Sequence, residues 1–206
     1  IVIDNLTKGG AEVLLVGILP ELNIKFDVFL VTLSNKCEFK EEAIICKQKF
    51  VLGFTGKSSL ISCIVKLKKI IHTISPSVIH THLFYSSLLG RLACSPKIPL
   101  VYTVHNELSK DIFNKNTLLK FIEKATIRKN HSVIAVSKLV LDDYAAAIHL
   151  TKKHFILKNY IADEYLIHKP ASKDFDQLKT FKIIAVGNLK ESKNYEYLIE
   201  SFIHLK

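Results

Sequence analysis

Short apolar runs alternate with amphipathic stretches of helical length along almost the whole chain, and this alternation restricts the fold more than any other feature of the sequence. We predict strands at residues 1–3, 25–33, 43–46, 77–82, 99–105, 131–137, 153–157 and 181–187. The runs are continuously apolar, which is typical of parallel strands that are covered on both faces. Strands that alternate with helices predict an α/β fold, with a parallel sheet and helices on both faces.

The length of 206 residues suits one large domain, or one domain followed by part of another. A polar stretch without periodicity ends at Thr180. We therefore predict a first domain over residues 1–170, a linker over 171–180, and the first strand and helix of a second domain over 181–206. The four cysteines are scattered, without disulfide or metal-ligand spacing, and we interpret them as reduced packing residues of a cytoplasmic protein.

The net charge of +10 comes almost entirely from lysine, because the chain contains only two arginines, Arg91 and Arg128. Proteins that read base edges rely on arginine, so we expect no sequence-specific nucleic-acid partner. The predicted helix over residues 117–129 spaces Lys120, Lys124 and Arg128 at helical intervals. Its other side is expected to hold the apolar residues Leu118, Phe121, Ile122 and Ala125. Such a helix suits either peripheral contact with an anionic membrane or an ordinary solvated surface.

Polar or glycine residues stand where the predicted strands end, at the edge where parallel sheets bind ligands. These residues are Gly9, Gly10, His82, His105, Ser137 and Gly187. The two glycines of the first turn can adopt positive φ and carry no Cβ, so a ligand can approach the backbone there. The helix that follows presents unpaired N–H groups, which suit a phosphate or another anion, although a plain structural turn has the same pattern.

Five side chains are weighed as candidates for chemistry. His105 ends an apolar strand, where it would act either as a hydrogen-bonding or acid–base group or as a loop anchor. His80 and His82 share one face of a strand, but no third ligand lies nearby in the sequence, so we expect no metal site. Ser137 lacks the surroundings of a nucleophilic serine and is expected to cap a helix. Lys193, at the start of the last helix, could neutralise a diphosphate.

Six segments, taken in order, resemble motifs of the family-4-type retaining glycosyltransferases. They are residues 9–12 (GGAE), 78–82 (VIHTH), 101–105 (VYTVH), 133–137 (VIAVS), 156–163 (ILKNYIAD) and 186–194 (VGNLKESKN). The resemblance implies the GT-B architecture, in which two Rossmann-like domains face each other across a cleft. The first domain would receive the acceptor, and the second would hold the nucleotide-sugar donor.

The resemblance also implies roles for individual residues. Gly10 would lie near the donor phosphate and the reacting sugar, His105 would act at the reaction centre, and Lys193 would bind the donor diphosphate. The implied substrate-binding positions are Gly9, Gly10, His82, Ser137, Asn159, Asn188 and Lys193. No cofactor and no metal ion would be needed, since a UDP- or GDP-sugar would be the donor substrate.

This sequence departs from the family pattern at three points. Asn188 stands where the family usually has arginine, and Tyr160 stands where it usually has glycine. The paired glutamates that grip the donor would lie beyond Lys206, so we expect a truncated second domain and little transferase activity from these residues alone.

The resemblance implies transfer to a cell-surface glycan or a lipid-linked acceptor, in the cytoplasm or at the inner face of the plasma membrane. Two alternatives remain open at this stage. One is a nucleotide-sugar 2-epimerase of the same fold, and the other is a non-catalytic binding or partner subunit.

Overall fold

The computed structural model describes residues 1–149, 153–161, 183–187, 189 and 193–204. The chain divides into two compact units, unit 1 over residues Ile1–Ala162 and unit 2 over residues Asp163–Lys206. Unit 1 contains the sheet and the helices that cover it. The described part of unit 2 contains one helix, α7 (Tyr195–Ile203).

Unit 1 is built on one sheet of seven parallel strands in the order β3-β2-β1-β4-β5-β6-β7. The strands are β1 (Val2–Ile3), β2 (Phe29–Thr32), β3 (Gln48–Val51), β4 (Ile79–His82), β5 (Leu100–Val104), β6 (His131–Ala135) and β7 (His154–Ile156). The chain first runs outward from β1 to β3, and then returns to place β4 on the other side of β1. The order therefore reverses between β1 and β4, and such a switch point is where open parallel sheets bind ligands.

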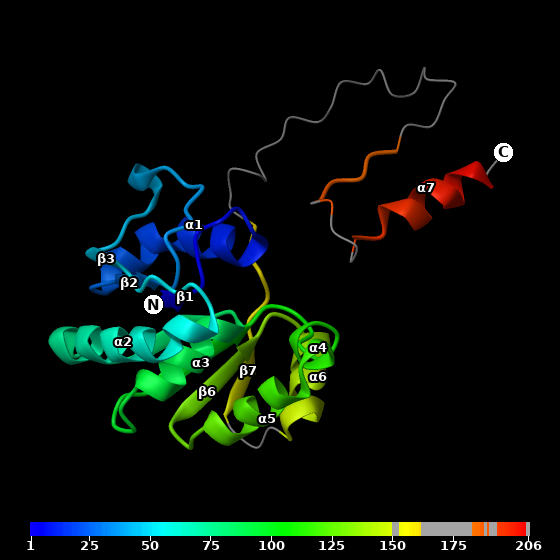
Figure 1. The fold of residues 1–206 in the computed structure, drawn as a ribbon. Coiled ribbons are helices and arrows are strands. Elements are labelled where there is room, and N and C mark those ends of the chain that lie inside the picture. Colours follow the sequence, from blue (N-terminus) through cyan, green and yellow to red (C-terminus); the bar gives the residue numbers. More distant parts are fainter. Residues whose placement is uncertain (150–152, 162–182, 188, 190–192, 205–206) are drawn as a thin grey trace. The chain divides into compact units, whose positions relative to one another are not determined.

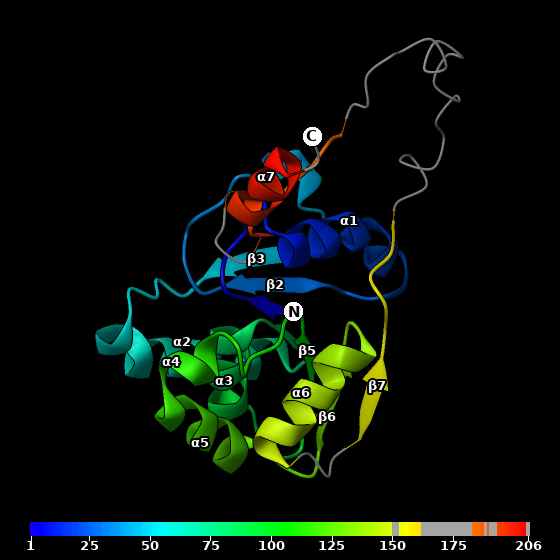
Figure 2. The ribbon, with the colours of Figure 1, turned by 90° about the vertical axis from the view of Figure 1, so that its right-hand side faces the viewer.

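Helices cover both faces of this sheet, as predicted. In unit 1 they are α1 (Gly10–Lys25), α2 (Leu60–Ile74), α3 (Phe84–Ala93), α4 (Ile112–Lys115), α5 (Thr117–Thr126) and α6 (Lys138–Ile148), with short 3-10 turns at Glu41–Ala43 and Lys57–Ser59. Helix α1 lies on one face, whereas α2, α3 and α6 lie on the other, with α5 packed against α3 and α6 (Figures 1 and 2).

The two faces of the sheet bury two separate sets of apolar side chains. Ile3 and Leu30 pack on the side of α1 against Leu19, and each of the three is fully buried. The adjacent residues Val2 and Val31 point to the opposite face and join the larger core. Because successive residues of a strand face opposite sides, burial on both faces explains why the strands are continuously apolar.

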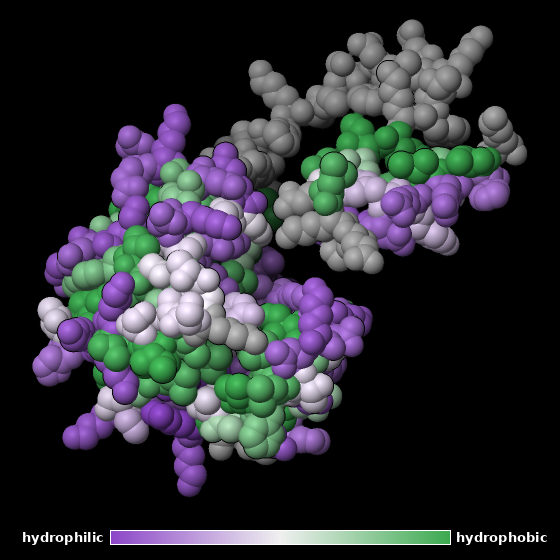
Figure 3. Space-filling view, viewed as in Figure 1, coloured by the Kyte–Doolittle hydropathy of each residue, from purple (hydrophilic) through white to green (hydrophobic). Residues whose placement is uncertain are grey.

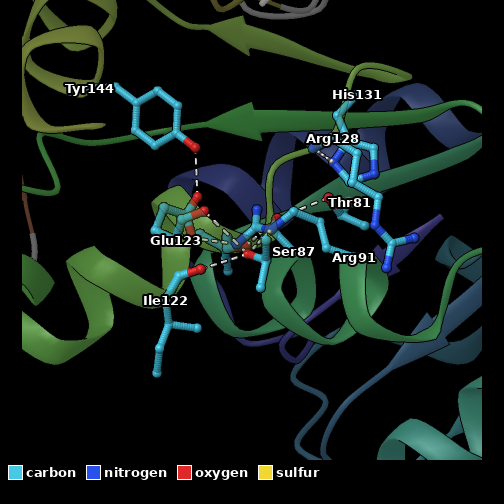
Figure 4. A network of polar contacts seen from close by, with 10 residues as sticks. Thr81, Ser87, Arg91, Ile122, Glu123, Arg128, His131 and Tyr144 are labelled. Carbon is cyan, nitrogen blue, oxygen red and sulfur yellow. Dashed lines mark hydrogen bonds and ion pairs between the residues drawn. The ribbon is translucent and has the colours of Figure 1, made fainter. Parts of the chain in front are cut away.

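A buried polar network lies within the larger core, between α3, α5 and α6 (Figure 4). The Arg91 guanidinium forms an ion pair with the Glu123 carboxylate, and both side chains are almost completely buried. Tyr144 donates a hydrogen bond to the same carboxylate at 2.6 Å, and Arg91 Nε donates to Thr126 Oγ1 at 3.0 Å. The guanidinium also lies over the Tyr102 ring, 5.6 Å from its centroid. This network fixes the position of α5 against the core.

The predicted third strand at residues 43–46 was wrong. Ala43 ends a 3-10 turn, Ile44 is buried beneath α1, and the strand is β3, at Gln48–Val51. An isolated apolar residue such as Ile44 can fill the core from a loop. In contrast, β3 is an edge strand whose side chains are partly or fully exposed, so its sequence is more polar than that of a central strand.

The strand predicted at residues 181–187 is not formed in the part that the structure describes. Ile183 and Val186 have no strand pairing there, and both side chains are exposed. A strand is defined by a hydrogen-bonded neighbour, and the described residues of unit 2 provide none. Residues 181–182 lie outside the described part of the chain. The predicted helix is present as α7.

The predicted orientation of the helix at residues 117–129 was wrong in part. Leu118 and Phe121 are 62% and 69% exposed, and Glu123 is the residue that the helix buries most deeply. The ion pair between Glu123 and Arg91 turns this side of the helix toward the core. The helix also ends at Thr126, so Arg128 lies beyond it.

Candidate functional site

Polar residues stand at the carboxyl ends of β1, β4 and β5, next to the switch point. Asp4 follows β1, His82 is the last residue of β4, and His105 follows β5. Because β4 pairs with both β1 and β5, the ends of these three strands lie side by side. The structure thus brings together His82 and His105, which the sequence singled out, and adds Asp4, which it did not.

The central feature is a histidine cluster, consisting of His80, His82 and His105. His82 Nδ1 lies 3.1 Å from His105 Nε2, which is hydrogen-bonding distance. The rings of His80 and His82 are neighbours on the same face of β4, with 4.2 Å between centroids. His80 Nε2 is 2.7 Å from Thr103 Oγ1 on the adjacent strand β5. The cluster therefore ties β4 to β5 and holds the His105 ring at the edge.

Burial keeps the three rings uncharged at neutral pH. It lowers the pKa of His80 and of His105 to about 4. The pKa of His82 also lies well below its usual range, first because of burial and then because of its two histidine neighbours. Neutral imidazoles can both donate and accept hydrogen bonds, so this edge suits polar, uncharged groups such as hydroxyls.

Asp4 anchors the first turn of α3 to the end of β1. Its Oδ1 accepts hydrogen bonds from Ser86 N at 2.8 Å and from Ser86 Oγ at 2.5 Å. Burial raises the pKa of the Asp4 carboxyl, and the two bonds from Ser86 oppose that rise. The only sequence signal for Asp4 is its place directly after the first apolar run, and nothing in the sequence identifies Ser86 as its partner.

Backbone strain is also present at this point. Leu83, between His82 and the first residue of α3, has φ 68° and ψ 166°. Only glycine adopts this region readily, and a residue held there costs about 1–3 kcal/mol. Such strain is concentrated at ligand sites and switch regions, which supports placing the site at the end of β4.

The glycine turn differs in detail from the prediction. Gly9 caps α1 with φ −88°, and Gly10 also has a negative φ, so neither uses the left-handed conformation. A Cβ on Gly9 would lie 2.4 Å from Glu12 Oε2, because the Glu12 carboxylate folds back over the turn. A Cβ on Gly10 would meet no atom within 4 Å. The turn is therefore open at Gly10, as close approach of a ligand requires, whereas the Glu12 side chain occupies the space beside Gly9.

The remaining predicted residues lie elsewhere along the same edge or outside unit 1. Ser137 caps α6, accepting a hydrogen bond from Val140 N at 3.2 Å, as predicted from the sequence. Asn159 is exposed after β7. Lys193 is exposed in unit 2, just before α7. Its side chain lies near Gly187, since a Cβ placed on Gly187 would be 3.8 Å from Lys193 Cδ. Asn188 lies outside the described residues.

Tyr160, which departs from the family pattern, has a structural role. Its hydroxyl donates a hydrogen bond to Leu14 O of α1 at 3.0 Å. A Cβ on Gly17 would be only 2.6 Å from this hydroxyl, so the glycine leaves room for it. Tyr160 therefore holds the segment after β7 against α1.

A cavity of about 410 Å³ lies toward the amino edge of the sheet, where Leu22, Phe29 and Val78 contribute to its lining, and it extends along β4 as far as His80. We place the site at the carboxyl edge instead, because the polar cluster and the switch point coincide there. Within the described residues, no group of three or more His, Cys, Asp or Glu side chains is arranged to hold a metal ion.

The fold defines an α/β protein with a parallel, Rossmann-like sheet, and the histidine cluster lies at the edge where such sheets bind ligands. Comparison with protein families matches residues 8–161 to Glycosyltransferase Family 4, and the chain belongs to this family. The family assignment confirms the resemblance found in the sequence and the GT-B type of fold, and it supports a glycosyltransferase in general. A search of curated proteins gave no match.

Proposed function

We propose that this chain is the acceptor-side part of a retaining, metal-independent glycosyltransferase. The enzyme would transfer a sugar from a UDP- or GDP-sugar to a cell-surface glycan or a lipid-linked acceptor. The observation that carries the proposal is the contact between His82 and His105 at the carboxyl edge of the sheet, near the switch point, in a chain that belongs to this family. Uncharged imidazoles at this edge suit sugar hydroxyls, and Gly10 leaves the neighbouring backbone accessible.

In this proposal His105 hydrogen-bonds to the reacting sugar or the acceptor, and Gly9 and Gly10 form the wall beside them. Lys193, with Asn188 nearby in sequence, would neutralise the diphosphate of the donor as its bond to the sugar breaks, an electrostatic role. His82, Ser137 and Asn159 lie at or just beyond strand ends on the acceptor side. The acceptor oxygen forms the new bond to the anomeric carbon, the nucleoside diphosphate leaves with the electrons of the broken bond, and the proton of the acceptor hydroxyl passes to the departing diphosphate.

The test is release of nucleoside diphosphate by the protein as its gene encodes it, including any sequence after Lys206, with and without acceptor. We expect acceptor-dependent release, a product with the anomeric configuration of the donor, and no effect of a chelator. His105→Ala is expected to lower kcat/KM at least about 100-fold, the scale of losing one preorganised hydrogen bond in the transition state. Turnover without acceptor would instead favour a 2-epimerase, and donor binding only to a separate subunit would favour a partner module.

Peripheral contact with an anionic membrane is a further part of this proposal. Leu118 and Phe121 are exposed on α5, and the nearby Lys124 and Arg128 are exposed as well. In Figure 3 hydrophobic side chains reach the surface in the region of α5, with hydrophilic side chains beside them. This combination suits a helix that lies on negatively charged lipid headgroups. No helix of the described residues is both long enough and apolar enough to cross a membrane.

Cosedimentation with vesicles tests this contact. Leu118→Ser combined with Phe121→Ser is expected to reduce binding to vesicles that contain anionic lipid, and high salt should reduce it as well. Ile61→Ser is the matched control, because Ile61 is an exposed apolar residue of α2. Equal losses for the α5 variant and the control, or equal binding to neutral vesicles, would contradict the proposed contact.

A further inference from the structure

The contact between His82 and His105 restricts where each ring carries its proton. Both rings are neutral near pH 7, and a neutral imidazole has one N–H donor and one acceptor nitrogen. Across the 3.1 Å between His82 Nδ1 and His105 Nε2, one ring must donate and the other must accept. The direction of this hydrogen bond also decides whether His105 Nδ1 is a donor or an acceptor at the edge of the sheet, because a neutral ring carries its proton on only one of its two nitrogens.

The surroundings of His82 favour one of the two arrangements. Its other nitrogen, Nε2, is buried and has no hydrogen-bond partner in the part of the chain that the structure describes. If His105 donated, His82 would keep its proton on Nε2, and this N–H would be buried without an acceptor. If His82 Nδ1 donates, Nε2 retains only a lone pair. Orphaned buried N–H groups are rarer in native proteins than under-satisfied acceptors, so the second arrangement is favoured.

We propose that His82 is a positioning residue that donates from Nδ1 to His105 Nε2 and so holds His105 as its Nδ1–H tautomer. His105 Nδ1 is not among the buried nitrogens that lack a partner, and none of the described residues forms a hydrogen bond with it, so it is open to solvent at the edge. His105 then presents an N–H donor there. It would donate to an oxygen lone pair of the sugar or the acceptor, rather than remove a proton as a base.

This inference depends on the proposed function only for the identity of the oxygen, and not for the tautomer itself. Histidine-selective ¹⁵N NMR of the 206-residue chain at pH 7 reads the tautomers without any substrate. We expect His105 to carry its proton on Nδ1 with about tenfold preference, the ratio that one net hydrogen bond supplies. His131 is the internal reference for a tautomer that a fixed donor imposes: its Nδ1 accepts from the backbone N–H of Arg128 at 3.1 Å. It should therefore carry its proton on Nε2, although that nitrogen is also buried without a partner among the described residues.

Three variants separate a positioning role from a merely structural one. His82→Asp replaces the donor with a carboxylate acceptor, and His105 should then carry a proton on Nε2. His82→Asn places an amide N–H near the original Nδ1 and should restore the Nδ1–H form. His80→Gln is the matched control, because His80 neighbours His82 but pairs with Thr103, and it should leave His105 unchanged.

An Nε2–H tautomer for His105 in the unmodified chain would overturn the proposal, and so would the absence of a proton on His105 Nε2 in folded His82→Asp. If His82→Asp does not fold, the spectra of the unmodified chain and of His82→Asn still decide. Absence of sugar transfer with the expected tautomer would refute only the proposed function. Transfer by a protein whose His105 is the Nε2–H tautomer would refute only the role of His82.

Discussion

Removing the negative charge from the buried Arg91–Glu123 pair should destabilise the protein strongly. Arg91 and Glu123 are 1% and 0% exposed, so Glu123→Gln leaves a guanidinium in the core without a counter-ion. Breaking a buried pair in this way typically costs about 3–5 kcal/mol of unfolding free energy. Tyr144 loses a charged acceptor in the same variant. With a urea m-value of about 2 kcal/mol/M, the unfolding midpoint should fall by roughly 1.5–2.5 M.

The double variant Arg91→Met with Glu123→Leu should not show this loss of unfolding free energy. Removing both charges and keeping similar volume avoids the uncompensated ion, and such replacements are often neutral or stabilising. The double variant should therefore be much more stable than Glu123→Gln alone. Asp27→Asn is the surface control, since Asp27 pairs with Lys47 where both side chains are largely exposed, and it should cost less than about 1 kcal/mol.

Urea unfolding followed by far-ultraviolet circular dichroism measures all four proteins, because the chain contains no tryptophan. A loss below about 1 kcal/mol for Glu123→Gln would show that water or another group compensates Arg91, contrary to the buried geometry. A double variant less stable than Glu123→Gln would show that the ion pair contributes net stability, which would refute the desolvation argument.

Three further predictions concern stability. Because the pKa values of the histidine cluster are lowered in the folded state, the unfolded chain binds more protons between pH 6.5 and 4, and the unfolding free energy should fall as the pH falls through that window. The shift of the His80 pKa to about 4 alone corresponds to about 3 kcal/mol. Asp4, whose pKa is raised, acts in the opposite direction, and an equal urea midpoint at pH 7 and pH 5 would contradict the expectation. Gly90→Ala should lower the thermal midpoint, because its Cβ would lie 2.7 Å from a methyl group of β4 and overpacking costs about 1–3 kcal/mol; an unchanged midpoint would show that α3 can shift. Gly17→Ala should stabilise a Tyr160→Phe variant by up to about 1 kcal/mol, because alanine has the higher helix propensity. The gain should be smaller in the unmodified chain, where the new Cβ would lie 2.6 Å from the Tyr160 hydroxyl. Equal effects in a urea double-mutant cycle would exclude contact with this hydroxyl.

The fold was predictable because its main determinants are local. Each central strand is an apolar run that ends in a polar residue, and each crossover needs a helix, so order along the chain nearly dictates a parallel sheet. The error at β3 has a physical cause: an edge strand is only half buried, and its apolar signal was weaker than that of Ile44 in the preceding loop. The error in α5 is different, since a charged residue faces inward there and its partner on α3 lies 32 residues away.

Only those residues of the candidate site that stand at the ends of strands could be predicted from the sequence. His82 and His105 could be found because each terminates an apolar run, and parallel pairing of β4 with β5 then brings them together. The role of Asp4 depends on its bond to Ser86, 82 residues away, and no periodic pattern encodes such a pair. Burial of His82 Nε2 also depends on tertiary packing, and it is this burial that distinguishes the two tautomers.

The glycine turn shows how the structure changes an inference from sequence. A free helix N-terminus attracts anions, which is why the turn suggested a phosphate site. In the folded chain the Glu12 carboxylate already lies over Gly9, within the first turn of α1, and the electrostatic effect of Glu12 also raises the Asp4 pKa. The Glu12 side chain therefore occupies the space beside Gly9, so a ligand can approach the backbone of the turn more closely at Gly10, where a Cβ would meet no atom within 4 Å.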